Sequence, residues 1–214
     1  MIQFVTGTDT GVGKTVACAA LALQSRADGL DVRYFKPVQT GLGPDEPGDV
    51  DFVTRVTGVE GEEGARFREA LAPAVAARMA GATVDVDALR QQALALHETS
   101  DLLIVEGAGG LLVPLSDDVD MAEFARSLSA DLVVVARPGL GTLNHTALTL
   151  EAARSRGFDP VVVVSNWPVD PGLTETTNLE ALREMAPVLG LVPAIPDLDV
   201  ESGLAPFPPA LVPA

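Results

Sequence analysis

The sequence predicts a single α/β domain in which a mostly parallel central sheet carries helices on both faces. Apolar runs of four or five residues alternate with helix-like segments along the 214-residue chain. These runs are continuously apolar, which is typical of strands buried on both faces. Polar and glycine-rich clusters follow the runs, at the sheet edge where parallel sheets bind their ligands. The chain is long enough to bury one such core.

Six apolar runs are expected to form the strands. Each is rich in Val, Ile, Leu or Phe, and each is followed by a glycine, a proline or a polar residue. Pro37 is expected to end the second of them, because proline cannot donate a ladder hydrogen bond. The six runs are Ile2–Thr6, Val32–Lys36, Leu102–Val105, Leu132–Ala136, Val161–Ser165 and Leu191–Ile195.

Helix-like patterns separate these strands. Thr15–Ala27 is apolar on nearly every side and is expected to be buried, and Gly157 is expected to end a helix over Thr142–Arg156. Residues 203–214 are rich in proline and are expected to form an extended arm. Further helices are expected over Asp51–Thr57, Arg66–Met79, Asp85–His97, Met121–Leu128 and Thr174–Met185.

Composition excludes several classes of protein. The formal net charge is −16, which opposes binding to nucleic acid or to an anionic membrane surface. A single cysteine, Cys18, excludes a disulfide framework and fits a reducing compartment. Met1 leads directly into an apolar strand without a basic leader, and no apolar run approaches the ~20 residues that span a bilayer. We therefore expect a cytoplasmic protein with no nucleic-acid or membrane partner.

A glycine-rich segment follows the first strand and precedes the first helix. Gly7–Thr15 reads Gly-Thr-Asp-Thr-Gly-Val-Gly-Lys-Thr, with one residue more than usual between the first glycine and Gly-Lys-Thr. Its context is that of a phosphate-binding P-loop, in which backbone N–H groups and a helix N-terminus hold the phosphates. The fold is therefore expected to be P-loop NTPase-like. The residues expected to form this nucleotide site, which the family resemblance described below assigns to ATP, are Asp9, Thr10, Gly11, Val12, Gly13, Lys14, Thr15 and Val16.

Two lysines stand out because the chain otherwise uses arginine. Its 14 basic residues are twelve Arg and only two Lys, Lys14 in the P-loop and Lys36 at the end of the second strand. Lys36 begins the segment Lys-Pro-Val-Gln-Thr-Gly and is expected to reach the same crevice as Lys14. Two cations over one phosphate group favour phosphoryl transfer over simple nucleotide storage.

Acidic residues near the P-loop predict a Mg²⁺ site. Glu106 ends an apolar strand, the position that brings a carboxylate near the P-loop metal, and the Thr15 hydroxyl is a second expected ligand. Asp49 and Asp51 lie in the loop beyond Lys36, and either could complete the site. The sequence leaves the choice between them open.

A second glycine-rich segment begins the helix expected over Thr142–Arg156. Gly139–His145 reads Gly-Leu-Gly-Thr-Leu-Asn-His, and the free N–H groups of such a helix start favour an anion such as a carboxylate. His145 falls about one turn inside the helix, where a packed or capping role is more common than catalysis.

Four of these motifs together resemble the dethiobiotin synthetase family. They are the P-loop, Lys36–Gly41, Val105–Gly110 and Leu140–His145, and the resemblance extends from Ile2 to about Pro196. The long glycine spacing is that family's own form of the P-loop. The resemblance implies ATP- and Mg²⁺-dependent carboxylation of 7,8-diaminopelargonic acid with CO₂ and closure of a ureido ring, through a carbamate and a carbamic-phosphoric anhydride.

The resemblance also implies roles for individual residues. Lys14, Lys36 and Thr10 would act in catalysis, and Asn166 would contact adenine. The family shares each active site between two subunits, so a homodimer is implied. Gly11 stands where some relatives carry Glu, so any role of that side chain is absent here. Thr40, Gly141, Thr142, Leu143 and Asn144 would bind the substrate, and Thr15, Asp51 and Glu106 would hold Mg²⁺.

Two other readings share the predicted core. Cobyrinic-acid and cobyric-acid amide synthetases carry an additional glutaminase domain, which a chain of 214 residues has no room for. Partitioning ATPases carry a second lysine five residues before the P-loop lysine, and this chain has Asp9 there.

Overall fold

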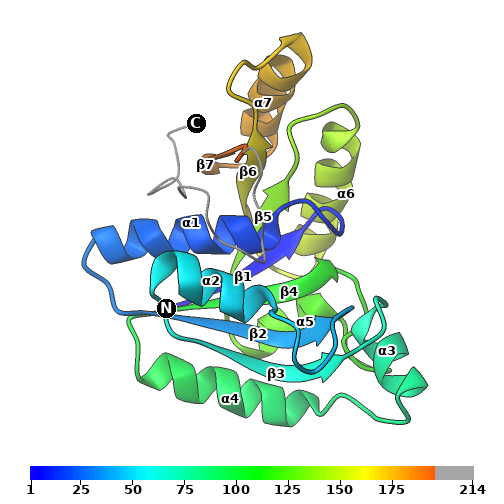
Figure 1. The fold of residues 1–214 in the computed structure, drawn as a ribbon. Helices are drawn as coiled ribbons and strands as arrows, with labels where there is room; N and C mark the ends of the chain where they lie inside the picture. The colour runs from blue at the N-terminus through cyan, green and yellow to red at the C-terminus, as the bar shows by residue number, and fades with distance from the viewer. Residues whose placement is uncertain (196–214) are drawn as a thin grey trace.

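The computed structural model describes residues 1–195 and contains a seven-stranded sheet in which every neighbouring pair is parallel (Figure 1). The strand order is β3-β2-β4-β1-β5-β6-β7. The expected α/β fold class is therefore confirmed. The strands are β1 (Ile2–Gly7), β2 (Val32–Thr40), β3 (Gly61–Phe67), β4 (Leu102–Gly110), β5 (Asp131–Ala136), β6 (Val161–Trp167) and β7 (Val188–Pro193).

Helices cover both faces of the sheet and enclose two hydrophobic clusters (Figure 1). On one face, α1 (Lys14–Ala27) and α2 (Asp49–Thr57) pack against the smaller cluster. The larger cluster lies on the other face, against the remaining helices. These are α3 (Pro73–Met79), α4 (Val86–Glu98), α5 (Met121–Ser127), α6 (Thr142–Ser155) and α7 (Leu173–Met185).

The register of β2 and β4 brings the predicted functional side chains together. Phe35 pairs with Val105, and the side chains of the next residues, Lys36 and Glu106, meet at 2.7 Å. Successive side chains of a strand point to opposite faces. Tyr34 belongs to the cluster under α1 and α2, so Lys36 and Glu106 also point toward that face. The P-loop follows β1, which pairs with β4.

One strand was missed and one helix was misplaced by the sequence analysis. Residues 61–67 form the edge strand β3, whereas a helix was expected from Arg66 onward. The segment carries glycines and charges and pairs only with β2, so it lacks the apolar signature of a strand buried on both faces. The helix itself begins at Pro73, a residue suited to a first helical turn.

Pro37 does not end β2, contrary to expectation. The strand continues to Thr40, and its pairing with β3 resumes at Val38 opposite Ala65. Beyond Phe35, β2 is no longer in register with β4, so a missing N–H is tolerated on that side. Strand β2 therefore carries Lys36, Gln39 and Thr40 on one rigid element.

No helix among residues 1–195 is both long and apolar enough to cross a membrane. The proline-rich segment expected to form an arm, residues 203–214, lies outside the described residues.

Candidate active site

The P-loop is shaped by two glycines that no other residue could replace without strain. Gly13 caps α1 with φ of 90°, and a Cβ there would lie 2.3 Å from Ser165 Oγ. A Cβ on Gly7 would lie 2.7 Å from the Asp9 carbonyl oxygen and 3.2 Å from Lys14 Nζ. Because Gly7 has no side chain, Lys14 can fold back over the loop, where its ammonium group donates to the Asp9 carbonyl at 3.3 Å.

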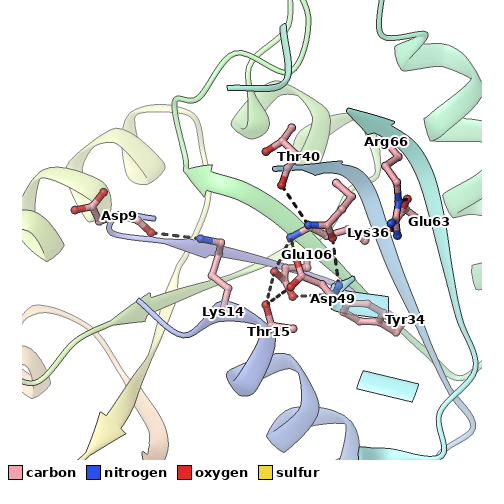
Figure 2. A network of polar contacts seen from close by, with 11 residues as sticks. Asp9, Lys14, Thr15, Tyr34, Lys36, Thr40, Asp49, Glu63, Arg66 and Glu106 are labelled. Carbon is pink, nitrogen blue, oxygen red and sulfur yellow. Dashed lines mark hydrogen bonds and ion pairs between the residues drawn. The ribbon is translucent and has the colours of Figure 1, made fainter. Parts of the chain in front are cut away.

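Four side chains from four elements meet beside the P-loop (Figure 2). The Lys36 ammonium group lies 2.7 Å from Glu106 Oε1 and 2.6 Å from Asp49 Oδ2. The Thr15 hydroxyl lies 3.0 Å from both Asp49 Oδ1 and Glu106 Oε1. A hydroxyl has one proton and can donate to only one of these oxygens. Thr15, Asp49 and Glu106 thus bring one hydroxyl and two carboxylate groups together, and oxygen ligands of this kind are the ones that Mg²⁺ prefers.

Charges in this network reinforce one another despite burial. Burial alone would lower the pKa of Lys36, but the carboxylates of Glu106 and Asp49 outweigh it and raise that pKa well above its ordinary value. Burial would raise the pKa of Asp49, and the Lys36 ammonium group reverses this and lowers it. Burial lowers the pKa of Lys14, although Glu106 opposes the shift. Lys36 is therefore a fixed cation and Asp49 a fixed anion.

The two candidate aspartates lie in different surroundings. Asp49 lies in the network, whereas Asp51 is exposed and accepts a hydrogen bond from the Gly48 N–H at 2.7 Å, as part of the capping box of α2. Asp51, the expected metal ligand, is therefore not brought to Thr15 and Glu106. Spacing could not reveal this, because both residues lie in the first turn of one helix.

This difference gives a matched pair of variants. We expect Asp49→Asn to raise the Mg²⁺ concentration needed for half-maximal ATP turnover about tenfold, because it removes a charged oxygen ligand. Asp51→Asn should leave that concentration unchanged and lower stability by about 1 kcal/mol through its weakened cap. A Mg²⁺ titration of both variants checks this. A larger change for Asp51→Asn than for Asp49→Asn would contradict the placement.

The loop that delivers Asp49 is held by Arg66 and Gln39. The Arg66 guanidinium group binds Glu63 through two nitrogens and donates to the Gly43 and Glu46 carbonyl oxygens at 2.9 and 2.6 Å. The Gln39 side-chain oxygen accepts from the Asp49 N–H at 3.2 Å. Asp49 is therefore fixed from both sides although it follows a long loop. Neither Arg66 nor Gln39 was singled out from the sequence.

A cavity of about 340 Å³ opens above the network. It is lined by both lysines, by Thr15, Asp49 and Glu106, and by the predicted P-loop residues Thr10, Gly11, Gly13 and Val16. Thr40 also lines it, whereas Asp9 and Val12 do not. Asp9 instead accepts from the Thr10 N–H at 2.7 Å.

Known proteins resemble the chain in sequence over most of its length. Residues 3–202 match a family described as AAA domain. The ATP-dependent dethiobiotin synthetase BioD of Mycobacterium sp. (strain JLS) is 48% identical over 200 residues, covering 90% of this chain and 87% of the relative. That of Frankia casuarinae is 47% identical over 196 residues, covering 89% and 82%. The chain belongs to the dethiobiotin synthetase family. The resemblance seen in the four motifs is thus confirmed.

Solved structures share the fold at low sequence identity. The MinC:MinD cell division protein complex of Aquifex aeolicus matches with a TM-score of 0.57 and 14% identity, covering 94% of this chain and 86% of that one. The signal recognition particle receptor FtsY of Elizabethkingia anophelis, in complex with GDP, matches with a TM-score of 0.52 and 18% identity, covering 89% and 56%. These matches confirm the P-loop NTPase-like fold.

The adenine position expected for a dethiobiotin synthetase lies on the other side of the P-loop. Asn166 is exposed at the end of β6 with φ of 59° and lines a second cavity of about 300 Å³. Val12, Ser165 and Pro193 line the same cavity. Gly11, Gly13 and Val16 line both cavities, so the two adjoin across the P-loop.

The glycine-rich start of α6 is not brought to the first cavity within one chain. None of Gly141, Thr142, Leu143 and Asn144 lines it in the described structure. Thr142 is fully buried within the described chain, with its hydroxyl 3.5 Å from that of Thr146. Asn144 is exposed.

Two buried residues lie next to Glu106 on the side of the core. Tyr34 donates its hydroxyl proton to Glu106 Oε2 at 2.7 Å, and burial together with the Glu106 charge raises the pKa of Tyr34 well above its ordinary value. Burial, with Glu106 second, likewise raises the pKa of the Cys18 thiol. Cys18 is a core residue, as its pattern indicates, whereas Tyr34 was missed because Val32–Lys36 was interpreted only as an apolar strand.

Proposed function

We propose that the chain is an ATP- and Mg²⁺-dependent dethiobiotin synthetase. It would use 7,8-diaminopelargonic acid, CO₂ and ATP and form dethiobiotin, ADP and phosphate. The observation that carries the proposal is the convergence of two lysines and two carboxylates on one cavity at the P-loop, in a chain 48% identical to a named synthetase. A single buried cysteine supports a cytoplasmic location.

In the proposed reaction, one amine of the substrate takes up CO₂ and becomes a carbamate. A carbamate oxygen attacks the γ-phosphorus of ATP and displaces ADP, giving the carbamic-phosphoric anhydride. The second amine then attacks the carbonyl carbon, closes the ureido ring and expels phosphate. The protein need not supply a nucleophile, and no Cys, His or Ser lines the cavity among the described residues. Its task is to hold the reactants in line and to balance charge.

The charges of the site residues suggest a role for each of them in the proposed reaction. The charges of the two lysines cancel those of the two carboxylates, so these four groups together carry no net charge. A Mg²⁺ ion held by Thr15, Asp49 and Glu106 would neutralise phosphate charge. Lys14 and Lys36 would stabilise the transferring phosphoryl group and the carbamate, with Thr10 and Thr40 as hydroxyl donors. Adenine would occupy the cavity at Asn166.

The decisive experiment measures ATP turnover with and without the diamine. The synthetase should release ADP only when 7,8-diaminopelargonic acid and bicarbonate are both present, and mass spectrometry should detect dethiobiotin in the same amount. Turnover that does not depend on the diamine would instead support an ATPase of the partitioning class.

We further propose a homodimer in which each site takes its substrate-carboxylate contacts from the other subunit. The start of α6 lies outside the cavity of its own chain, which supports this arrangement. Exposed apolar side chains on α6, just before it and beside the P-loop also support it. Leu112, Leu140 and Leu148 are 51%, 87% and 59% exposed, and Leu112 and Leu148 line a hollow of about 470 Å³ that reaches Thr8, Asp9 and Thr10.

A subunit-mixing experiment tests the shared site. Asn144→Asp keeps the size of the side chain and places a negative charge at the start of α6, so it should weaken diamine binding about tenfold and leave ATP binding intact. Mixing Asn144→Asp chains with Lys14→Ala chains should restore activity, because one site of each heterodimer then has an intact P-loop and an intact partner loop.

Asn144→Gln is the control, because it keeps the neutral amide and should remain active alone. Native mass spectrometry must show that the subunits have exchanged. Exchange without recovered activity would contradict the shared site and leave each site within one chain.

A further inference from the structure

The two oxygens of the Glu106 carboxylate have different partners. Oε1 faces Lys36 at 2.7 Å and Thr15 at 3.0 Å, on the side of the cavity. Oε2 accepts from the Tyr34 hydroxyl at 2.7 Å, on the side of the core. Glu106 is 1% exposed and Tyr34 is fully buried, so water does not compete for this bond. Figure 2 shows Tyr34 and Lys14 on opposite sides of Glu106.

The Tyr34 ring fits into the sheet because its neighbour in β3, Gly61, has no side chain. Tyr34 pairs with Ile104 in β4 and with Gly61 in β3. A Cβ on Gly61 would lie 3.0 Å from Tyr34 Cδ1 and 3.1 Å from Val50 Cγ1 of α2. The ring therefore occupies the space above Gly61, where it is fully buried. Its hydroxyl group is consequently presented to Glu106 at a fixed position.

We propose that Tyr34 is a positioning residue that holds Glu106 Oε2 so that Oε1 faces Thr15, Asp49 and the bound metal. This inference rests on the proposed function, because it gives Glu106 the role of a metal ligand. A carboxylate held at one oxygen loses the freedom to rotate about its last side-chain bond. Metal binding then costs less conformational entropy, because the side chain is already fixed. Hydrogen bonds to metal ligands typically change metal affinity by about 10- to 100-fold.

The alternative is that Tyr34 only fills the core and uses Glu106 to satisfy its own hydroxyl group. Under that alternative, Tyr34→Phe would lower stability but leave metal binding unchanged. Under the positioning role, Tyr34→Phe keeps the ring above Gly61 and leaves Glu106 Oε2 without its donor. Metal affinity should then fall more than the turnover measured at saturating metal.

The first test measures Mn²⁺ binding by electron paramagnetic resonance in the presence of ADP, with full-length protein. We expect the Kd of Tyr34→Phe to be about tenfold above that of the unchanged protein. We expect kcat at saturating Mg²⁺ to fall by less than about threefold. Thr57→Val is the matched control, because it removes another buried hydroxyl on the same face, one that donates to the Val53 carbonyl oxygen at 2.6 Å and accepts from the Val59 N–H at 3.0 Å. Its Mn²⁺ affinity should not change.

The second test needs no substitution. Tyr34 is the only tyrosine of the chain, so protein labelled with ¹³C at the tyrosine Cζ gives one resonance from this site. Saturating Mg²⁺ with ADP should shift that resonance relative to ADP alone, because the acceptor of the phenol proton becomes a metal ligand.

The outcomes separate the two proposals. If the unchanged protein binds no Mn²⁺ with ADP, the proposed function fails. If it binds Mn²⁺ while Tyr34→Phe binds equally well, or while the ¹³C resonance does not move with Mg²⁺, the positioning role alone is overturned.

Discussion

Lys14→Ala is expected to lower dethiobiotin formation by at least about a hundredfold, equivalent to about 3 kcal/mol of transition-state stabilisation. Lys14 is 7% exposed and lines the cavity at the P-loop, so its charge acts where water screens it weakly. The methyl group of alanine removes one of the two lysine charges over the phosphates, the one that the P-loop itself carries. Steady-state turnover with saturating ATP and diamine measures the effect.

Arg68→Ala is the charge-matched control, because Arg68 is exposed and its loss changes the net charge equally. Its turnover should match that of the unchanged protein. Lys14→Ala should also unfold at nearly the same temperature, since Lys14 has one long hydrogen bond of 3.3 Å and no ion pair within the described structure. Near-normal turnover in Lys14→Ala would refute the role of the P-loop lysine.

Lys36→Arg is expected to lower turnover by about fiftyfold or more, although it keeps the positive charge. Lys36 is 5% exposed and reaches two carboxylates at 2.6 and 2.7 Å with a single compact ammonium group. The planar guanidinium group is wider and binds carboxylates side-on, so it cannot occupy the same point between Asp49 and Glu106. ATP binding, measured by calorimetry, should be largely kept.

Lys36→Met separates geometry from charge. It leaves Glu106 buried without its cation, so the free energy of unfolding should fall by about 3–5 kcal/mol. Lys36→Arg keeps a cation there and should lower the free energy of unfolding by less. Added Mg²⁺ should recover part of the stability of Lys36→Met if Asp49 and Glu106 bind the metal. Wild-type turnover in Lys36→Arg would mean that only the charge matters.

The parts of the site that the sequence predicted are those encoded locally. The P-loop, Lys36 and Glu106 each follow a strand directly, and parallel strands bring their carboxyl ends to one edge. The strand order did not have to be known, because these groups meet whenever the three strands that precede them lie next to one another in a parallel sheet. The P-loop glycines are likewise local, since Gly13 needs its positive φ whatever surrounds it.

The missed parts depend on contacts between distant segments. Tyr34 and Glu106 are 72 positions apart, and only the register of β2 with β4 makes them partners. The choice between Asp49 and Asp51 depends on the rotation of α2, which Gln39 and Arg66 help to fix. Strand β3 was missed because it lies at an edge, where burial does not impose an apolar sequence.

The burial of both lysines has a practical consequence for amine chemistry. The chain contains no third lysine, so the amino terminus is its only other primary amine. Met1 is 61% exposed at the start of β1, whereas the P-loop follows the opposite end of that strand. A surface that carries acylating groups cannot enter the cavity where Lys14 and Lys36 lie, so it would couple to folded molecules through the amino terminus alone. All of them would be held in one orientation, with the catalytic edge turned outward.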